Sequence, residues 1–241
     1  MKTIIFVIAF TASIAARANF EQCRSEFPGG VVPKIVAIAQ PAEGLRALCF
    51  DGFAVLHSGD SRGPVYAVER LTAARLADAG DEQRTDHFYP EARLPFSDRA
   101  QLDDYKNSGY DRGHMAPAAD MPTQNAMAQS FSLANIVPQS PKHNRGLWAK
   151  VVEGPTRRYV ERAAGDVFVF TGAAYVNQRR TIKNIWIPTH IYKLVYDATT
   201  KRAWAYWTAN RDDERMSAPV TYHELVRLTG FEFLPGVTVA P

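Results

Sequence analysis

The sequence predicts an α+β fold in which helices pack against a central antiparallel sheet. The chain has 241 residues, of which 46% are hydrophobic and 22% charged, so it can bury one large core. Apolar segments typical of strands vary in length and do not alternate regularly with helical segments, which favours α+β over a doubly wound parallel sheet. No internal repeat, low-complexity block or linker interrupts the chain. We therefore expect a single domain over residues 19–241, behind a leader over residues 1–18.

The N-terminus has the features of a secretory signal peptide. Lys2 supplies a basic start, residues 4–14 are apolar, and Ala16-Arg17-Ala18 is a small-x-small cleavage site before Asn19. The alternative is an ordinary buried N-terminal helix. No stretch approaches the roughly 20 apolar residues of a membrane span, so no membrane partner is expected. The leader predicts a periplasmic or secreted protein.

Cys23 and Cys49 are the two cysteines of the chain. In an oxidising compartment they are expected to pair and to fasten the N-terminal arm. A loop of that length would stabilise the fold by roughly 3–4 kcal/mol in the chain-entropy model. The alternative is two separate buried thiols.

The first half of the chain predicts short strands and loops. Residues 31–55 suggest loop and short strand, with residues 50–57 the better strand candidate, and residues 65–68 form a second apolar strand. Residues 72–79 predict a short helical or irregular piece. Residues 81–108 carry charges and prolines without periodicity, as expected of a surface segment that lies over an active site.

The second half predicts more regular elements. A strand ends at His114, a loop follows over residues 115–124, and residues 125–131 are expected to be helical. Apolar positions at helical spacing predict a longer helix over residues 144–164. The remaining expected elements are strands over residues 133–137, 167–171, 186–188, 190–196 and 203–208, and a helix over residues 221–229.

The motif Asp111-Arg112-Gly113-His114 is the most informative part of the sequence. Alternate side chains of a strand point to the same face, so Arg112 and His114 are expected to face one cleft. His114 can act as a general base toward water, and Arg112 can hold a phosphate oxygen through two parallel hydrogen bonds. The structural alternative for His114 is a hydrogen-bonded core histidine. Asp111 is expected to support a neighbouring side chain rather than to perform chemistry.

Two further blocks follow at a characteristic spacing, Phe131 to Gln139 and Asn144-Arg145-Gly146-Leu147-Trp148. In this order the three blocks resemble the DNA/RNA non-specific endonucleases, and the similarity extends from about Cys23 to the C-terminus. The resemblance implies a ββα-metal (His-Me) finger and a metal-dependent endonuclease that cleaves DNA and RNA with little sequence preference.

The resemblance also implies roles for single residues. Asn144 would carry the metal ion, with Mg²⁺ expected and Mn²⁺ as the alternative, because a hard cation takes oxygen ligands and keeps several waters. Its structural alternative is a helix N-cap. Asn135 would orient the site by hydrogen bonds, or else serve as a turn residue. Arg84 and Arg157 would contact phosphate beside Arg112, while Trp148 is expected in the core.

One departure from the family pattern concerns the acidic residue of the site. The family places it four residues after the tryptophan, where this chain has Val152, and Glu153 follows one position later. On an ideal α-helix, Glu153 would lie about 180° around from Asn144, against about 80° at the usual spacing. A π-bulge around residues 151–155 would return Glu153 to the metal side, and Pro155 favours a local irregularity. The alternative is a regular helix that exposes Glu153.

The charge balance limits how nucleic acid can bind. The chain has 28 basic and 25 acidic residues, and two of the basic residues lie in the predicted leader, so the remainder is close to neutral. Binding of DNA or RNA must therefore depend on a local basic cleft. The arginines that can line such a cleft are Arg84, Arg112, Arg145, Arg157, Arg179 and Arg180. Three others, Arg158, Arg162 and Arg202, are expected to be solvated.

Two other functions remain compatible with the sequence. One is a non-catalytic nucleic-acid-binding or uptake protein on the same fold, although such a protein needs neither a base nor a metal ligand. The other is a nuclease with a narrower substrate range, set by the shape of its loops. The sequence leaves the oligomeric state open, and a homodimer is one of the states it allows.

Overall fold

The computed structural model describes residues 19–37, 41, 43–176 and 179–240. The predicted signal peptide over residues 1–18 lies outside the described residues. No helix among the described residues is both long and apolar enough to cross a membrane.

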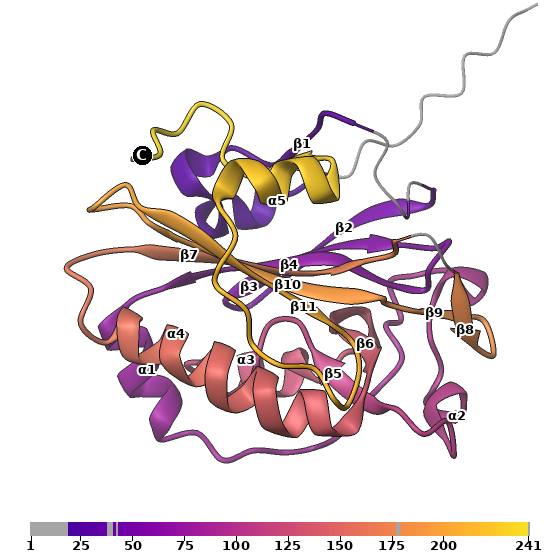
Figure 1. Cartoon of the computed structure of the whole chain (residues 1–241). Helices are drawn as coiled ribbons and strands as arrows, with labels where there is room; N and C mark the ends of the chain where they lie inside the picture. The colour runs from indigo at the N-terminus through magenta and orange to yellow at the C-terminus, as the bar shows by residue number, and fades with distance from the viewer. Residues whose placement is uncertain (1–18, 38–40, 42, 177–178, 241) are drawn as a thin grey trace, which may run out of the picture.

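A six-stranded antiparallel sheet forms the centre of the molecule (Figure 1). Its strand order is β11-β10-β7-β4-β3-β2, so β11 and β2 are the edge strands. The strands are β2 (Leu45–Phe50), β3 (Phe53–Ser58), β4 (Gly63–Leu71), β7 (Val167–Ala174), β10 (His190–Asp197) and β11 (Ala203–Ala209). The α+β fold predicted from the sequence is confirmed.

Three small two-stranded sheets surround this centre. The pairs are β1 (Lys34–Ile35) with β12 (Phe231–Glu232), β5 (Asp111–His114) with β6 (Ile136–Gln139), and β8 (Arg180–Ile182) with β9 (Ile185–Ile187).

The helices are short, and several begin at a threonine that caps them. The side chains of Thr72, Thr123 and Thr221 each accept a backbone N–H of the first turn, which satisfies a donor that the helix itself cannot pair. The α-helices are α1 (Ala73–Gly80), α2 (Leu102–Tyr105), α3 (Gln124–Ser130), α4 (Gly154–Val160) and α5 (Tyr222–Thr229). A π-helix (His143–Glu153) runs directly into α4. The 3₁₀ helices are Glu21–Glu26, Pro28–Gly30, Phe96–Asp98, Ala118–Asp120 and Leu133–Asn135.

The sheet is covered on both faces (Figure 1). One face packs against α5 and the N-terminal arm, and its core is rich in aromatic rings such as Tyr66, Phe170 and Phe233. The other face packs against α1, α3, α4 and the β5–β6 hairpin. Trp148 and Val152 of the π-helix are buried in the core on this side. The hairpin and the helix that follows it are therefore fixed by the sheet.

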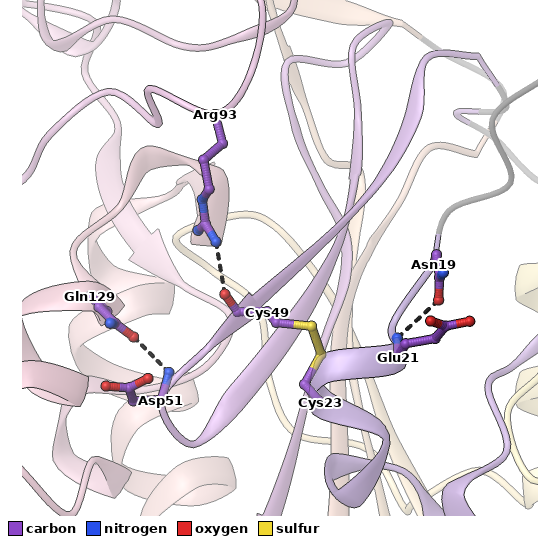
Figure 2. Close-up of a disulfide and its surroundings, with 7 residues drawn as sticks. All are labelled: Asn19, Glu21, Cys23, Cys49, Asp51, Arg93 and Gln129. Carbon is purple, nitrogen blue, oxygen red and sulfur yellow. Dashed lines mark hydrogen bonds between the residues drawn. A yellow bond between two sulfur atoms is a disulfide. The ribbon is translucent and has the colours of Figure 1, made fainter.

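A disulfide joins Cys23 to Cys49, as the sequence predicted (Figure 2). The two Cα atoms are 5.6 Å apart, and 26 residues separate the cysteines in the chain. The bond fastens the first 3₁₀ helix to strand β2. The carbonyl of Cys49 also accepts a hydrogen bond from Arg93 Nη1 at 2.8 Å, visible in the same view.

Some expected elements differ from those observed. The strand predicted over residues 50–57 contains a turn at Asp51-Gly52, where Gly52 has φ of +100°, and is split between β2 and β3. The strand predicted over residues 133–137 begins as a 3₁₀ helix because the side chain of Ser132 accepts the N–H of Ala134. Strands β8 and β12 were not predicted, since two or three residues are too few for a recognisable alternation.

Candidate active site

The predicted finger consists of the hairpin β5–β6 followed by the π-helix. Asp111 pairs with Gln139 and His114 with Ile136 across the antiparallel ladder. Gly113 lies under the Gln139 side chain, and a Cβ at this position would come within 2.0 Å of Gln139 Oε1. The glycine between Arg112 and His114 therefore lets the two strands approach closely.

Arg112 and His114 share one neighbour, Phe88. The guanidinium carbon of Arg112 is 4.1 Å from the centroid of the Phe88 ring. The ring centroids of His114 and Phe88 are 5.5 Å apart. The two side chains that the alternation of β5 placed on one face thus lie against the same aromatic ring.

His114 sits in a protein environment that opposes its protonation. Its ring packs at right angles to the Phe131 ring, with centroids 5.0 Å apart. Burial lowers the pKa of His114 to about 3; the positive charges of Arg84 and Arg112 act in the same direction, and the charge of Asp86 acts against them. The imidazole is therefore neutral at physiological pH, which leaves it a nitrogen lone pair that can accept a proton.

The amide of Asn144 is held by Asp111. Asn144 Nδ2 donates to Asp111 Oδ2 at 2.9 Å, and Arg145 Nε donates to the same oxygen at 2.7 Å. Because the nitrogen is engaged, Asn144 Oδ1 is the atom available to a cation. Asp111 thus supports its neighbours, as expected. Asn144 lies inside the π-helix that begins at His143, so the N-cap alternative is wrong.

This donor set fits a hydrated divalent cation. Among the described residues, no group of three or more His, Cys, Asp or Glu side chains could enclose a metal ion. Mg²⁺ needs no such cage, because it retains several waters and takes few protein ligands. A single amide oxygen is therefore a sufficient protein contribution.

Asn135 fastens the segment that follows His114. The side chain is fully buried, and its Nδ2 donates to the carbonyls of Ala116 and Ser130 at 2.8 and 2.9 Å. Its Oδ1 accepts the N–H of Ala116 at 2.9 Å. All three bonds go to backbone groups, so Asn135 is a positioning residue that fixes the exit of β5.

The helix after the hairpin has the wide winding that the position of Glu153 required. The π-helix spans His143 to Glu153, whereas the widening was expected only around residues 151–155. A π-helical turn is about one residue longer than an α-helical turn, so the nine residues from Asn144 to Glu153 make about two turns. The two residues therefore belong to the same side of the helix. Val152, at the usual acidic position, is fully buried in the core.

Glu153 lies half-buried beside two cations. Burial raises the pKa of Glu153, with a further contribution from the charge of Asp120, and the charges of Lys193 and Arg157 act against this effect. Lys193 is itself buried, donates from Nζ to Thr171 Oγ1 at 2.6 Å, and sits 5.8 Å from the centroid of the Trp148 ring. Lys193 was predicted only as part of the strand over residues 190–196 and not as a site residue.

The other two predicted arginines lie in different places. The guanidinium carbon of Arg84 is 5.3 Å from the Phe131 ring centroid, which brings it beside His114. Arg157 donates from Nη1 to Asp120 Oδ1 at 3.0 Å and belongs to the surroundings of Glu153. The aromatic contacts of His114 with Phe88 and Phe131 were not predicted, although Phe131 begins the second block that carries the resemblance.

Comparison with known proteins gives a family match over most of the chain. The model of the DNA/RNA non-specific endonuclease family matches residues 33–240. Nuclease 1, mitochondrial, of Schizosaccharomyces pombe is 35% identical over 159 residues, which cover 60% of this chain and 49% of that protein. The chain therefore spans about half the length of that relative. Nuclease C1 of Cunninghamella echinulata is 32% identical over 85% of this chain and 86% of its own.

The fold has a counterpart among solved structures. The crystal structure of the EndoG/EndoGI complex contains a chain that superposes with a TM-score of 0.69 at 25% identity. The superposition covers 80% of this chain and 86% of that one.

The expectation of a periplasmic or secreted protein is contradicted by these relatives. The S. pombe protein and further matches in human and Saccharomyces cerevisiae are named as mitochondrial. The expectation depended on a short apolar leader that lies outside the described residues. A disulfide indicates an oxidising environment and does not by itself identify a compartment.

Proposed function

Because the chain belongs to the DNA/RNA non-specific endonuclease family, we propose that it is a metal-dependent endonuclease that hydrolyses phosphodiester bonds of DNA and RNA. The observation that carries the proposal is the arrangement of Arg112 and His114 on one face of β5, with Asn144 anchored to the same strand through Asp111. A base, a phosphate ligand and a cation ligand then come from one hairpin and the helix after it.

His114 would take the proton of the attacking water through Nε2, which has no hydrogen-bond partner among the described residues. Arg112 would hold a non-bridging oxygen of the scissile phosphate through charge-assisted hydrogen bonds. A divalent cation at Asn144 would offset negative charge on the phosphate and the leaving oxygen. We propose Mg²⁺ as this cation, with Mn²⁺ as the alternative. Glu153 would accept hydrogen bonds from water on that side of the site, with its charge supported by Lys193 and Arg157.

Phosphate contacts carry no information about base sequence, so a site built from arginines and a cation is suited to both DNA and RNA. A non-catalytic binding protein on this fold would need phosphate contacts alone. The placement of His114 and Arg112 against one ring, together with the oriented Asn144 amide, supports a catalytic function instead.

The test is incubation of purified protein with supercoiled plasmid and with single-stranded RNA, in Mg²⁺ and in chelator. We expect cleavage of both substrates in Mg²⁺ and none in chelator. His114→Ala should lower the rate by about 10²–10⁴-fold, because it removes the general base, while DNA binding persists in a gel-shift assay. Wild-type turnover by His114→Ala, or cleavage that is unaffected by chelator, would reject the proposed mechanism.

A further inference from the structure

A groove of about 360 Å³ lies beside the catalytic strand. It is lined by the segment from α2 to the start of β5, and its polar residues include Asp103, Lys106, Tyr110 and Arg112. We propose that this groove is a binding subsite for the nucleotide next to the scissile phosphate, with Tyr110 contacting the base and Lys106 a flanking phosphate. The inference rests on the proposed nuclease function and extends it to the path of the substrate strand.

The position of Arg112 connects this groove to the candidate active site. Arg112 lines the groove, and its guanidinium lies over Phe88, whose ring packs beside that of His114. Tyr110 precedes Arg112 by two residues, which is about 7 Å along an extended chain. A nucleic acid strand with its scissile phosphate at Arg112 and His114 therefore continues into the groove.

The groove offers the two kinds of contact that single nucleic acid strands use. Tyr110 presents an aromatic ring that is half-buried, and Lys106 presents an exposed ammonium group. Aromatic stacking and cationic contacts to phosphate are both independent of base identity. The carboxylate of Asp111 is already bonded to Asn144 and Arg145, so the exposed Asp103 is the acid of the lining that opposes an anion.

The β8–β9 hairpin adds positive charge at the rim of the groove. Arg180 Nη2 donates to the hydroxyl of Tyr110 at 3.1 Å, and Lys183 Nζ donates to the carbonyl of Asp103. Figure 1 shows this hairpin on the same side of the molecule as α2. The contact with Arg180 also fixes the tip of the Tyr110 ring. Tyr110 thus shares the groove with Lys106 and Arg112 and contacts Arg180 of the hairpin.

Charge variants test the phosphate contact. The probe is a fluorescent 12-nucleotide single-stranded DNA cleaved in Mg²⁺ at several NaCl concentrations. We expect Lys106→Ala to raise KM several-fold and to flatten the plot of log(kcat/KM) against log[salt] by about 0.7, the value for one phosphate contact on a single strand. Asp103→Asn should shift KM in the opposite direction. Lys34→Ala, an exposed lysine on β1, is the matched control and should equal wild type.

Base contact is tested with a fully abasic oligonucleotide of the same length, whose phosphates remain. Tyr110→Ala should weaken binding of the normal oligonucleotide several-fold and leave binding of the abasic one unchanged. Tyr110→Phe, which retains the ring, should bind the normal oligonucleotide within about twofold of wild type. A folding defect would weaken both ligands alike.

The same variants in a His114→Ala background separate this inference from the proposed function. Fluorescence anisotropy in chelator then measures binding without cleavage. If wild type does not cleave but the variants still show the predicted changes in binding affinity, the nuclease proposal fails and the groove proposal is supported. If wild type cleaves while Lys106→Ala, Asp103→Asn and Tyr110→Ala all match it in KM and in binding, the groove proposal is overturned.

Discussion

Burial controls protonation at more than one histidine of this chain. At His114 the protein combines desolvation with the positive charges of Arg84 and Arg112, and all three keep the ring neutral. His57, on β3 far along the chain from the finger, is fully buried as well. Burial lowers the pKa of His57 to about 4, and the charges of Asp98 and Glu91 oppose this effect without overcoming it.

The His57 pKa predicts a loss of stability in acid. Below pH 6.5, His57 becomes protonated in the unfolded chain but stays neutral in the folded chain. Its contribution to the free energy of unfolding is therefore fully present above pH 6.5 and is lost as the pH falls toward 4. The difference between the folded and unfolded pKa of His57 corresponds to a loss of at most about 3 kcal/mol in the free energy of unfolding. Urea unfolding at pH 7 and pH 4.5 measures it, and His57→Gln should show a smaller decrease than wild type. The exposed His223→Gln is the control and should retain the wild-type decrease. Equal decreases in all three proteins would show that His57 does not contribute.

The residues of the site differ in how far the sequence predicted them. Arg112 and His114 were predicted to share a face because strand alternation is a local rule, and the structure places both against Phe88. Phe88 itself belongs to a segment without periodicity, so its meeting with His114 depends on the path of the chain. The buried Lys193 was missed for the same reason, since its partners Thr171 and Glu153 come from other elements.

At the scale of elements, the π-helix shows both the strength and the limit of sequence spacing. The extra residue between Trp148 and Glu153 predicted a widened helix. Its extent, from His143 to Glu153, depends on the burial of Trp148 and Val152 against the sheet. Strands β8 and β12 depend on tertiary pairing in the same way, because each contains two or three residues and takes its shape from a partner.

Because the π-helix places Glu153 and Asn144 on the same side, we predict that Glu153 contributes to catalysis. Glu153→Gln should lower kcat by about 10–100-fold, as removal of a group that orients the surroundings of a metal does, without a large change in melting temperature. Kinetics in Mg²⁺ measure the effect.

A deletion provides the matched control for this prediction. Removal of the exposed Val151 takes out the extra residue, and regular α winding then places the glutamate about 80° from Asn144. This variant should retain more activity than Glu153→Gln. Wild-type turnover by Glu153→Gln would instead support an ion held by Asn144 and water alone.

At the scale of the whole molecule, the N-terminal arm forms part of the core on the sheet face opposite the finger. Phe20 and Phe27 flank the first 3₁₀ helix and pack into the aromatic cluster of that face. Glu26 accepts the backbone N–H of Arg70 at 3.0 Å and pairs with Arg75 at 3.5 Å. The arm thus contacts β4 and α1, and the disulfide links it covalently to β2. The β5–β6 hairpin packs against the other face.

This division predicts that the disulfide supports stability and not catalysis. Replacement of both Cys23 and Cys49 by serine should cost about 3–4 kcal/mol, because the unfolded chain loses a 26-residue loop constraint. The melting temperature should fall by roughly 10 °C. At 25 °C, kcat should stay within about twofold of wild type, since Arg112, His114 and Asn144 are positioned by the hairpin and the π-helix.

Thermal unfolding with and without reductant measures the effect on stability. Reductant should lower the melting temperature of wild type to that of the double variant and leave the variant unchanged. An unchanged melting temperature would show that the arm is held by packing alone, and a parallel loss of kcat would show that the two faces of the sheet are coupled.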